Sequence, residues 1–341
     1  MVKTHKPNLP IRPIVSNNQA PLYNLSKFLA NIISNVVDQG DYYVKNSFEF
    51  KKFIDQVRIP DDYILISLDV TSLYTNIPIN LVEQIVNNKW HILKNFTTLP
   101  KHEFQKALNF TLTTNFFQFK DKFYKQLDGV AMGSPISSVI AQLVMEHAEK
   151  CIIDNLTFDI LFYKRYVDDC LLAIPKNKEL EILNAFNSFH HKLQFTIERE
   201  QSNRINFLDL TLIRENDRIL TKWYTKSTSS GRYLHYNSEH HTTHKKNVII
   251  AVIDRSIRLT SPKYRHETIN KAKTLLLNNN YPSHLINDIT KRRIHAFYNH
   301  TNRINTQTPA SQIKYFSLPY VSNLSEKIGK IFQQHTIKIA H

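Results

Sequence analysis

Apolar and polar residues follow two different periods along the chain, and these periods predict its helices and strands. Over residues 22–37 apolar side chains recur every three or four positions, which predicts an amphipathic helix. Residues 62–69 form a short, nearly continuous apolar run that ends in an acid, as is typical of a buried strand. The same patterns predict further helices over 81–90, 102–110, 138–150 and 180–189.

Alternating segments predict a hairpin and a series of strands. Residues 116–124 form a predicted hairpin with its turn at 120–122. The remaining predicted strands cover 158–166, 170–174, 193–200, 205–214 and 218–224. From about residue 240 the pattern becomes helical, with helices expected over 247–259, 267–278 and 285–301. The sequence therefore predicts a mixed α+β body followed by a helical domain.

Composition excludes several common classes of protein. The 341 residues suggest about two domains, and an apolar fraction of 42% is enough for a packed core. With five Gly, the chain holds none of the usual glycine-rich phosphate loops. Its two Cys cannot form a disulfide framework, so we expect a reducing compartment and no disulfide-linked partner. Without a long apolar run or a signal-peptide core, we expect neither a membrane partner nor secretion.

Charge is concentrated in the last third of the chain. Residues 221–341 hold 19 basic and 5 acidic residues, whereas residues 1–220 hold 25 and 24. A basic third on a nearly neutral body indicates a polyanionic partner, most often a nucleic acid, although a solvated basic face would give the same pattern.

Three acidic residues lie at positions where an ionised carboxylate is energetically unfavourable. Asp69 ends one apolar strand, and Asp168 with Asp169 separates two others. Adjacent carboxylates raise each other's cost unless a cation binds between them. Hard cations such as Mg²⁺ prefer carboxylate oxygens, and two such ions can hold both oxygens of a phosphoryl displacement. An ordinary Asp-rich turn is the alternative.

These acids lie in motifs that resemble those of reverse transcriptases. Tyr166-Val-Asp-Asp169 is similar to the acidic hairpin of their palm, and Leu68-Asp-Val-Thr-Ser-Leu-Tyr74 to their first palm motif. Ala131-Met-Gly-Ser-Pro-Ile-Ser137, preceded by Gln126-Leu-Asp-Gly129, resembles the motif that supports template and incoming nucleotide.

A narrower resemblance is to the reverse transcriptases of Penelope-like elements. It rests on His5-Lys-Pro-Asn-Leu-Pro-Ile-Arg-Pro-Ile-Val-Ser16, Tyr23-Asn-Leu-Ser-Lys-Phe28, Ser67-Leu-Asp-Val-Thr-Ser-Leu-Tyr-Thr-Asn-Ile-Pro78, Phe207-Leu-Asp209, Gly231-Arg-Tyr-Leu-His-Tyr236 and Leu318-Pro-Tyr-Val321. Members of that family carry more of the fingers before the first of these segments, and many carry a downstream endonuclease. We therefore expect a truncated copy.

The resemblance implies a fold and a division of the chain. The fold would be an α+β right-hand polymerase with partial fingers, a palm with an antiparallel sheet and a helical thumb. The partial fingers and leading segment would cover 1–60, the palm 61–225, and a basic, helix-turn-helix-like thumb 226–341. The implied activity is RNA-directed DNA polymerisation, with an RNA template, a DNA primer and dNTPs as partners. The family's chromosomal targets imply a nuclear protein.

The resemblance also assigns roles to single residues. Asp69 and Asp168 would bind two Mg²⁺ or Mn²⁺ ions, assisted by Asp169 and the Val70 carbonyl. Tyr74 would exclude a ribose 2′-hydroxyl, or simply pack a turn. The other expected nucleotide contacts are Gln126, Gly133 and Ser134, and the cations Lys6 and Arg12, which suit a triphosphate. Residues 207–209 would form a strand of the primer grip, or an ordinary strand.

Basic residues on the C-terminal helices would contact the phosphates of a nucleic acid. The expected contacts are Lys245, Lys246, Arg255, Arg258, Lys291 and Arg292. The histidines at 235, 240, 241 and 244 suggest zinc, but without a nearby Cys we favour nucleic-acid contact. Two other functions stay open: an inactive nucleic-acid-binding remnant, and a two-metal nuclease, against which the order of the palm motifs argues.

Overall fold

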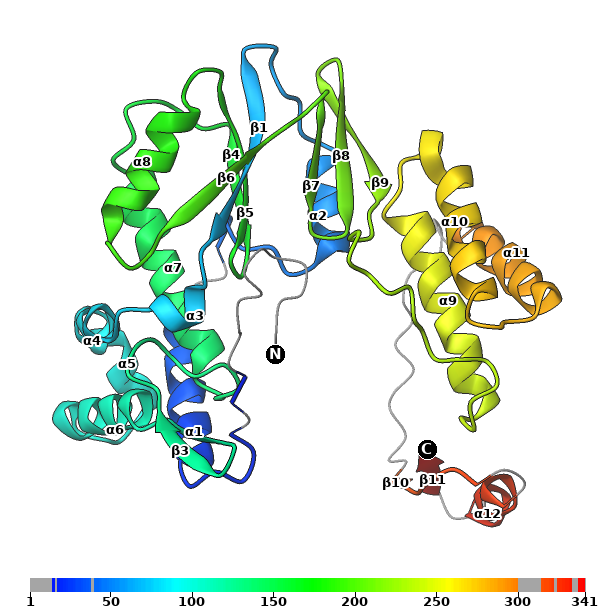
Figure 1. Ribbon diagram of the computed structural model, residues 1–341, viewed down its shortest axis with the longest axis horizontal. Coiled ribbons are helices and arrows are strands. Elements are labelled where there is room, and N and C mark those ends of the chain that lie inside the picture. The colour runs from blue at the N-terminus through cyan, green and yellow to red at the C-terminus, as the bar shows by residue number, and fades with distance from the viewer. Residues whose placement is uncertain are drawn as a thin grey trace. The chain divides into compact units, whose positions relative to one another are not determined.

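The computed structural model describes residues 14–15, 17–37, 40–299, 314–321, 324–332 and 337–340. Contacts along the chain divide it into two compact units (Figure 1). The first unit comprises Met1–Leu208 and Leu212–Ile219, and the second comprises Asp209–Thr211 and Leu220–His341. Each unit is described by itself below.

The first unit combines helices with four antiparallel strand pairings. Its helices are α1 (Tyr23–Ile33), α2 (Ser47–Ile54), α3 (Leu73–Asn76), α4 (Ile79–Asn88), α5 (Trp90–Leu93), α6 (Lys101–Thr113), α7 (Ser137–Ile153) and α8 (Glu179–Phe189), with short 3-10 turns η1 (Ser34–Val36) and η2 (Lys94–Phe96). Its strands are β1 (Tyr63–Val70), β2 (Phe116–Phe119), β3 (Lys122–Lys125), β4 (Phe162–Tyr166), β5 (Asp169–Pro175), β6 (Phe195–Arg199) and β7 (Arg204–Phe207).

A four-stranded sheet in the order β4-β5-β1-β6 forms the centre of this unit. β1 pairs antiparallel with both β5 and β6, and β4 pairs antiparallel with β5. The antiparallel palm sheet expected from the sequence is therefore confirmed. Because successive side chains of a strand point to opposite faces, each strand offers one set of residues to each side of the sheet.

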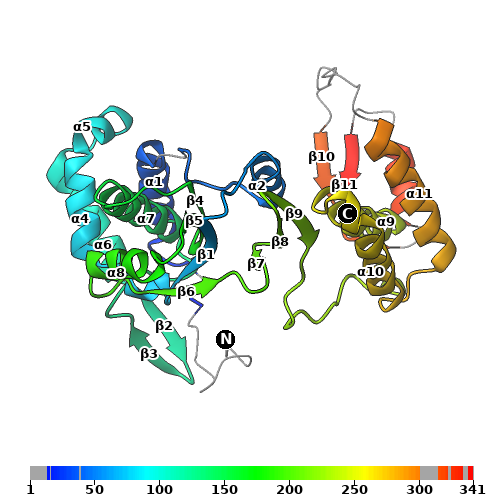
Figure 2. The ribbon, with the colours of Figure 1, turned by 90° about the horizontal axis from the view of Figure 1, so that it is seen from above.

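One face of the sheet is covered by helices. Ile66, Leu68 and Val70 of β1 belong to one buried cluster with residues of α7 and α8. Figures 1 and 2 show both helices on the same side of the sheet. The sequence explains why α7 lies there, because Leu143 and Val144 are among many buried apolar residues around this helix. The opposite face carries the alternate residues of β1, which end with Asp69.

The opposite face is covered along part of its length. Phe53 of α2 packs edge-on against Phe162 of β4, and Phe50 of the same helix packs against Phe207. α2 starts at this place because the Asn46 side chain accepts hydrogen bonds from the amides of Phe48 and Glu49, both at 3.0 Å. Asp69, near the end of β1, is exposed.

Two predicted strands differ from those in the structure. The segment predicted as one strand over 205–214 is two strands, β7 and β8 (Leu210–Glu215), which form a sheet in the order β7-β8-β9 with β9 (Arg218–Trp223). The chain turns between them because Leu208 has φ +55°, which no strand can contain. The strand predicted from residue 158 begins at Phe162, after bends.

The second unit is built around three helices. These are α9 (Thr242–Arg258), α10 (Arg265–Leu277), which follows the 3-10 turn η3 (Pro262–Tyr264), and α11 (Ser283–Asn299). Ile253 and Ile257 of α9, Leu276 of α10 and Ile286 of α11 are among its buried apolar residues. All three helices were predicted, with boundaries a few residues from those observed.

The region 226–341 also contains elements besides the three predicted helices. Besides α12 (Ser325–Phe332), it contains β10 (Lys314–Ser317) and β11 (Ile337–Ala340), which pair in parallel. The last helix predicted from the sequence ends at residue 301, and neither strand was predicted.

Candidate active site

Asp69 and Asp169 are brought together by strand register. The ladder between β1 and β5 places the two residues directly opposite each other. Directly opposite side chains of an antiparallel pair lie on the same face, with Cβ atoms about 5 Å apart. This face is the one opposite α7 and α8, so both carboxylates lie on the side of the sheet that these helices leave uncovered.

Asp168 lies beside this pair in the tight turn between β4 and β5. The amide of Val70 donates a hydrogen bond to the Asp168 carbonyl at 3.3 Å, which ties the turn to the end of β1. Asp168 and Asp169 are half-buried, whereas Asp69 is exposed. The structure thus gathers the three acids that the sequence separates by 99 residues, and with them Val70, the fourth expected metal ligand.

The turn that carries Asp168 has a strained backbone. Tyr166 pairs with Asp169, which leaves Val167 and Asp168 as the central residues of a two-residue turn. Val167 has φ +58°, a value at which a β-branched side chain is a genuine outlier and which glycine normally adopts. Such conformations persist only where surrounding contacts determine them, and they cluster at functional sites.

Thr196 of β6 is the neighbour of Asp69 on its other side. The register places the two residues opposite each other, and the Thr196 hydroxyl donates to the Asp69 carbonyl at 3.4 Å. One residue beyond the end of β1, the amide of Thr71 donates to the Gln194 carbonyl at 2.8 Å. The C-terminal end of β1 is therefore held from both sides.

Tyr74 follows the same strand and is half-buried on α3. Burial raises the pKa of its hydroxyl, and the negative charge of Asp168 raises it further. The expected contact of the Tyr74 ring with a nucleotide sugar stays a prediction.

The backbone of Gly129 packs closely against the backbone of Tyr74 and Thr75. A Cβ atom at Gly129 would lie 2.4 Å from the Tyr74 carbonyl oxygen and from the Thr75 carbonyl carbon, and Gly129 has φ +69°. The next amide, that of Val130, donates to the Tyr74 carbonyl at 2.7 Å. Glycine is required here both for the close approach and for the backbone angle. The sequence shows Gly129 within a motif but not this contact.

The loop before α7 contains Gly133 and Ser134. Gly133 is exposed with φ +113°, and Ser134 is buried. The loop is closed by the Ser137 hydroxyl, which donates to the Ala131 carbonyl at 2.7 Å. The amide of Val15 donates to the Met132 carbonyl at 2.9 Å. Lys6 and Arg12 lie outside the described residues.

Gln126 and Asp128 belong to the segment that leads to this loop. The Gln126 side-chain amide donates to the Asp128 carbonyl at 2.8 Å, so part of its hydrogen-bonding capacity is used within the segment. Asp128 forms an ion pair with Lys192 at 2.5 Å. This pair links the segment to the start of β6, and no sequence pattern indicated it.

The donor set of the acidic site suits a hard divalent cation. Asp69 and Asp169 offer carboxylate oxygens on one face of the sheet, and Asp168 lies in the adjoining turn; carboxylate oxygens are the ligands that Mg²⁺ and Mn²⁺ prefer. Within the described part of the chain, no group of three or more His, Cys, Asp or Glu side chains is placed so that it could hold a metal ion. The histidines at 235, 240, 241 and 244 accordingly form no such group either.

The expected nucleic-acid contacts of the second unit lie on α9 and α11. Lys246, Arg255, Arg258, Lys291 and Arg292 are exposed, and Lys245 is half-buried with its ammonium 5.3 Å from the centre of the Tyr236 ring. Arg255 forms an ion pair with Asp209 at 2.5 Å, so part of its charge is used within the unit. Phe207 is the last residue of β7 and Leu208-Asp209 form the turn after it, so residues 207–209 are not the continuous strand that the sequence predicted.

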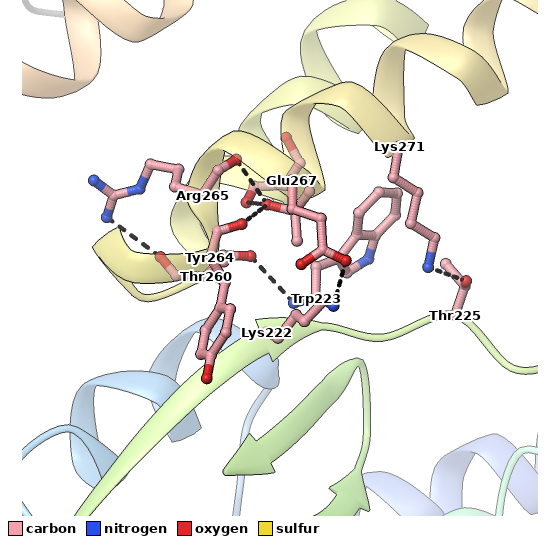
Figure 3. Close-up of polar contacts among 10 residues, drawn as sticks. Lys222, Trp223, Thr225, Thr260, Tyr264, Arg265, Glu267 and Lys271 are labelled. Carbon is pink, nitrogen blue, oxygen red and sulfur yellow. Dashed lines mark hydrogen bonds and ion pairs between the residues drawn. The ribbon is translucent and has the colours of Figure 1, made fainter. Parts of the chain in front are cut away.

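Other cations of this unit have structural contacts. Lys222 of β9 pairs with Glu267 of α10 at 2.6 Å, and Lys271 donates to the Thr225 hydroxyl at 2.7 Å (Figure 3). Burial lowers the pKa of Lys271, and the positive charge of Lys222 lowers it further. These contacts connect the end of β9 to α10. Lys222 and Lys271 therefore already interact within the unit, unlike a basic side chain whose charge is fully available to a ligand.

Comparison with known proteins identifies the family to which the chain belongs. The family described as reverse transcriptase (RNA-dependent DNA polymerase) matches residues 4–247, and an animal helix-turn-helix domain matches 232–291. The chain belongs to the reverse transcriptase family, and its fold is the α+β right-hand polymerase fold expected from the sequence. It is thus a member of a family of nucleic-acid polymerases. Among curated protein sequences, none matches.

Solved polymerase structures are similar to this chain at low sequence identity. Telomerase from Candida albicans, in complex with a TWJ fragment of telomeric RNA, has a TM-score of 0.57 and 14% identity over 81% of this chain and 48% of that chain. Apo telomerase from Candida tropicalis gives 0.47 and 12% over 77% and 50%. The Sicinivirus 3Dpol RNA-dependent RNA polymerase gives 0.44 and 13% over 73% and 54%. The chain spans about half the length of these proteins.

The described residues contain no helix with both the length and the apolar character that crossing a membrane requires.

Proposed function

We propose that this chain is the RNA-directed DNA polymerase of a Penelope-like retroelement, which extends a primer 3′-hydroxyl along an RNA template with dNTPs. The observation that carries the proposal is the placement of Asp69 opposite Asp169 beside the strained turn of Asp168. The Penelope-like assignment is supported by the ordered motifs from His5 to Val321, which run through both units. Nuclear residence belongs to the same proposal.

Asp69, Asp168 and Asp169 would hold two Mg²⁺ or Mn²⁺ ions, with the Val70 carbonyl as an additional ligand. The bound ions would lower the pKa of the primer hydroxyl and neutralise the triphosphate. The chain's own contribution is to bring Asp69 and Asp169 to one face, with Asp168 in the adjoining turn and Tyr74 on the helix that follows β1. The Tyr74 ring then excludes a 2′-hydroxyl, which favours deoxynucleotides.

The loop and the basic helices have supporting roles in the proposal. Gly133 and Ser134 lie where the loop before α7 allows close backbone approach, and Gln126 with Lys6 and Arg12 completes the nucleotide contacts. The exposed cations of α9 and α11 grip the phosphates of the template–primer duplex, which is an electrostatic interaction that weakens steeply with salt.

A second candidate function is a nucleic-acid-binding remnant without catalysis. The match of residues 232–291 to an animal helix-turn-helix domain and the basic composition of that unit favour it. An unrelated nuclease receives no support, because the matched family is one of polymerases.

One experiment separates the two candidates. The purified chain is mixed with a poly(rA) template and a labelled oligo(dT) primer, and binding is followed by fluorescence anisotropy while extension is followed after dTTP and Mg²⁺ are added. The proposal predicts binding and extension, with extension abolished by EDTA and by Asp168→Asn. Binding without extension in the presence of Mg²⁺ or Mn²⁺ would show that the chain is a remnant.

A further inference from the structure

Arg165 and Glu149 form a buried ion pair directly behind the acidic turn. The guanidinium Nε of Arg165 donates to the Glu149 carboxylate, and the two side chains are 3% and 1% exposed. Burying two charges costs several kcal/mol each before their attraction is counted, so such a pair is a costly way to fill a core. Neither residue belongs to the site proposed above.

The pair belongs to a buried hydrogen-bond network. The Tyr163 hydroxyl contacts the Glu149 carboxylate at 2.7 Å and the Cys170 sulfur at 3.0 Å. Burial raises the pKa of Glu149, while the charge of Arg165 and the Tyr163 hydrogen bond oppose that rise. A carboxylate with these partners is fixed in place, and so is the arginine that it holds.

Arg165 has a second contact, and this one reaches the turn. Its terminal NH1 group donates to the Val167 carbonyl at 3.3 Å. Val167 is the residue with φ +58°, and its carbonyl belongs to the peptide bond that leads into Asp168. The planar guanidinium thus holds Glu149 of α7 with one nitrogen and the strained peptide with another, a geometry that lysine cannot reproduce.

We propose that Arg165 is a positioning residue, which holds the Val167–Asp168 peptide in its strained conformation and so sets the metal affinity of the acidic site. This inference rests on the proposed function, because it assigns a consequence to metal binding there. Glu149 acts indirectly, because its carboxylate holds the Arg165 guanidinium in place. α7 begins just after the loop that contains Gly133 and Ser134, so the ion pair also connects that helix to the acidic turn.

The chain contains a matched control for this arrangement. Arg214 donates one terminal nitrogen to the buried carboxylate of Glu200 and another to the Tyr63 carbonyl at 2.8 Å. Its side chain and that of Glu200 are 12% and 5% exposed. Tyr63 lies at the opposite end of β1 from Asp69, so this arginine has the same type of contacts but no contact with the acidic turn.

The test compares Arg165→Lys with Arg214→Lys. Both variants keep a positive charge beside a buried glutamate. Both lose the guanidinium group that contacts the glutamate with one nitrogen and a backbone carbonyl with another. Metal binding is measured by Mn²⁺ electron paramagnetic resonance, with the Asp168→Asn/Asp169→Asn protein as background, and by the Mg²⁺ concentration that half-saturates primer extension. We expect Arg165→Lys to weaken both by roughly 10- to 100-fold, the usual effect of losing a residue that orients metal ligands, and Arg214→Lys to leave both unchanged.

A double variant covers the outcome in which Arg165→Lys does not fold. Replacing a buried ion pair by apolar residues of similar size is often neutral or stabilising, so Arg165→Met/Glu149→Leu should melt near the wild-type temperature. It lacks the donor to the Val167 carbonyl, so its affinity for Mn²⁺ should be reduced as in Arg165→Lys.

The possible results separate this inference from the function on which it rests. Wild-type metal affinity in either folded Arg165 variant, or an equal loss in Arg214→Lys, would overturn the positioning role while the polymerase proposal stands. A wild-type protein that neither extends a primer nor binds Mn²⁺ at the acidic site would refute the proposed function, and the positioning role with it.

Discussion

Asp69 lies directly across the antiparallel ladder from Asp169, and the Val70 amide one residue further along bonds to the Asp168 carbonyl. Strand register therefore decides that Asp69 and Asp169 meet, and the turn before β5 places Asp168 beside them. A slip of one residue in β1 would turn Asp69 to the face covered by α7 and α8. The buried residues Leu68 and Val70 prevent that slip, because it would expose them. The packing of the core thus fixes the geometry of the proposed metal site.

Tyr74 is predicted to exclude ribonucleotides. In Tyr74→Ala the aromatic ring is gone, so the preference for dTTP over UTP should fall by roughly tenfold or more. Competition between the two nucleotides in primer extension measures this preference. Tyr74→Phe keeps the ring and should keep the preference. Equal discrimination by the alanine variant and the wild-type protein would show that Tyr74 only packs the turn.

Gly129 is predicted to be intolerant of any side chain. Gly129→Ala places a methyl group 2.4 Å from the backbone at Tyr74 and Thr75 and forces alanine to φ +69°, so the free energy of unfolding should drop by roughly 2 kcal/mol or more. Urea unfolding measures the change. Gly329→Ala is the matched control, because nothing lies within 4 Å of a Cβ there. Equal stability of the two variants would contradict the described contact.

Two adjacent arginines of α11 are predicted to have different roles. Arg293 holds both carboxylate oxygens of Asp254 at 2.6 Å, whereas Arg292 is exposed and bonds to a carbonyl of its own helix. Arg292→Gln should weaken duplex binding and reduce the slope of log affinity against log salt by roughly one, the effect of one lost phosphate contact.

Arg293→Gln should instead lower the melting temperature, because it breaks the Asp254 ion pair between α11 and α9. Anisotropy titrations over a range of salt concentrations and thermal melting distinguish the two effects. An unchanged salt slope in Arg292→Gln would exclude this side chain from phosphate contact.

The two cysteines are predicted to react at very different rates with N-ethylmaleimide. Cys170 is fully buried beside the Tyr163 hydroxyl, and burial raises the pKa of its thiol, whereas Cys151 is partly exposed. Because the thiolate is the reactive form, mass spectrometry should find Cys151 modified first and Cys170 modified only after unfolding. In denaturant both should react alike. Equal rates in the native protein would contradict the packing behind the acidic turn.

The sequence predicted the elements around the site better than the contacts between them. Hydrophobic periodicity identified β1, α7 and the strands on both sides of Asp168, because each buries one face or its whole surface. It could not show that Asp69 faces Asp169, since register depends on how the strands pack. The close approach of Gly129 to Tyr74 was hidden for the same reason, because the two residues are far apart in the sequence.

Local backbone conformation was a second source of error. Val167 and Leu208 both adopt positive φ values that their residue types disfavour, so no propensity could predict them. The break at Leu208 explains why one predicted strand is two. The buried pair of Arg165 and Glu149 was also missed, because neither a charge in a strand nor one in a helix reveals its partner. Periodicity reports burial, whereas these features depend on tertiary contacts.

The account depends most on the carboxylates of Asp69 and Asp168, and steady-state primer extension on a poly(rA)·oligo(dT) substrate tests them directly. Asn replaces each carboxylate by an amide of the same shape, and Asp121→Asn, at the exposed turn between β2 and β3, is the matched control. The account predicts that Asp69→Asn and Asp168→Asn fold and bind the duplex but lose at least roughly 10³-fold in rate, while Asp121→Asn extends like the wild-type protein. Extension at the wild-type rate by either Asp69→Asn or Asp168→Asn would contradict it.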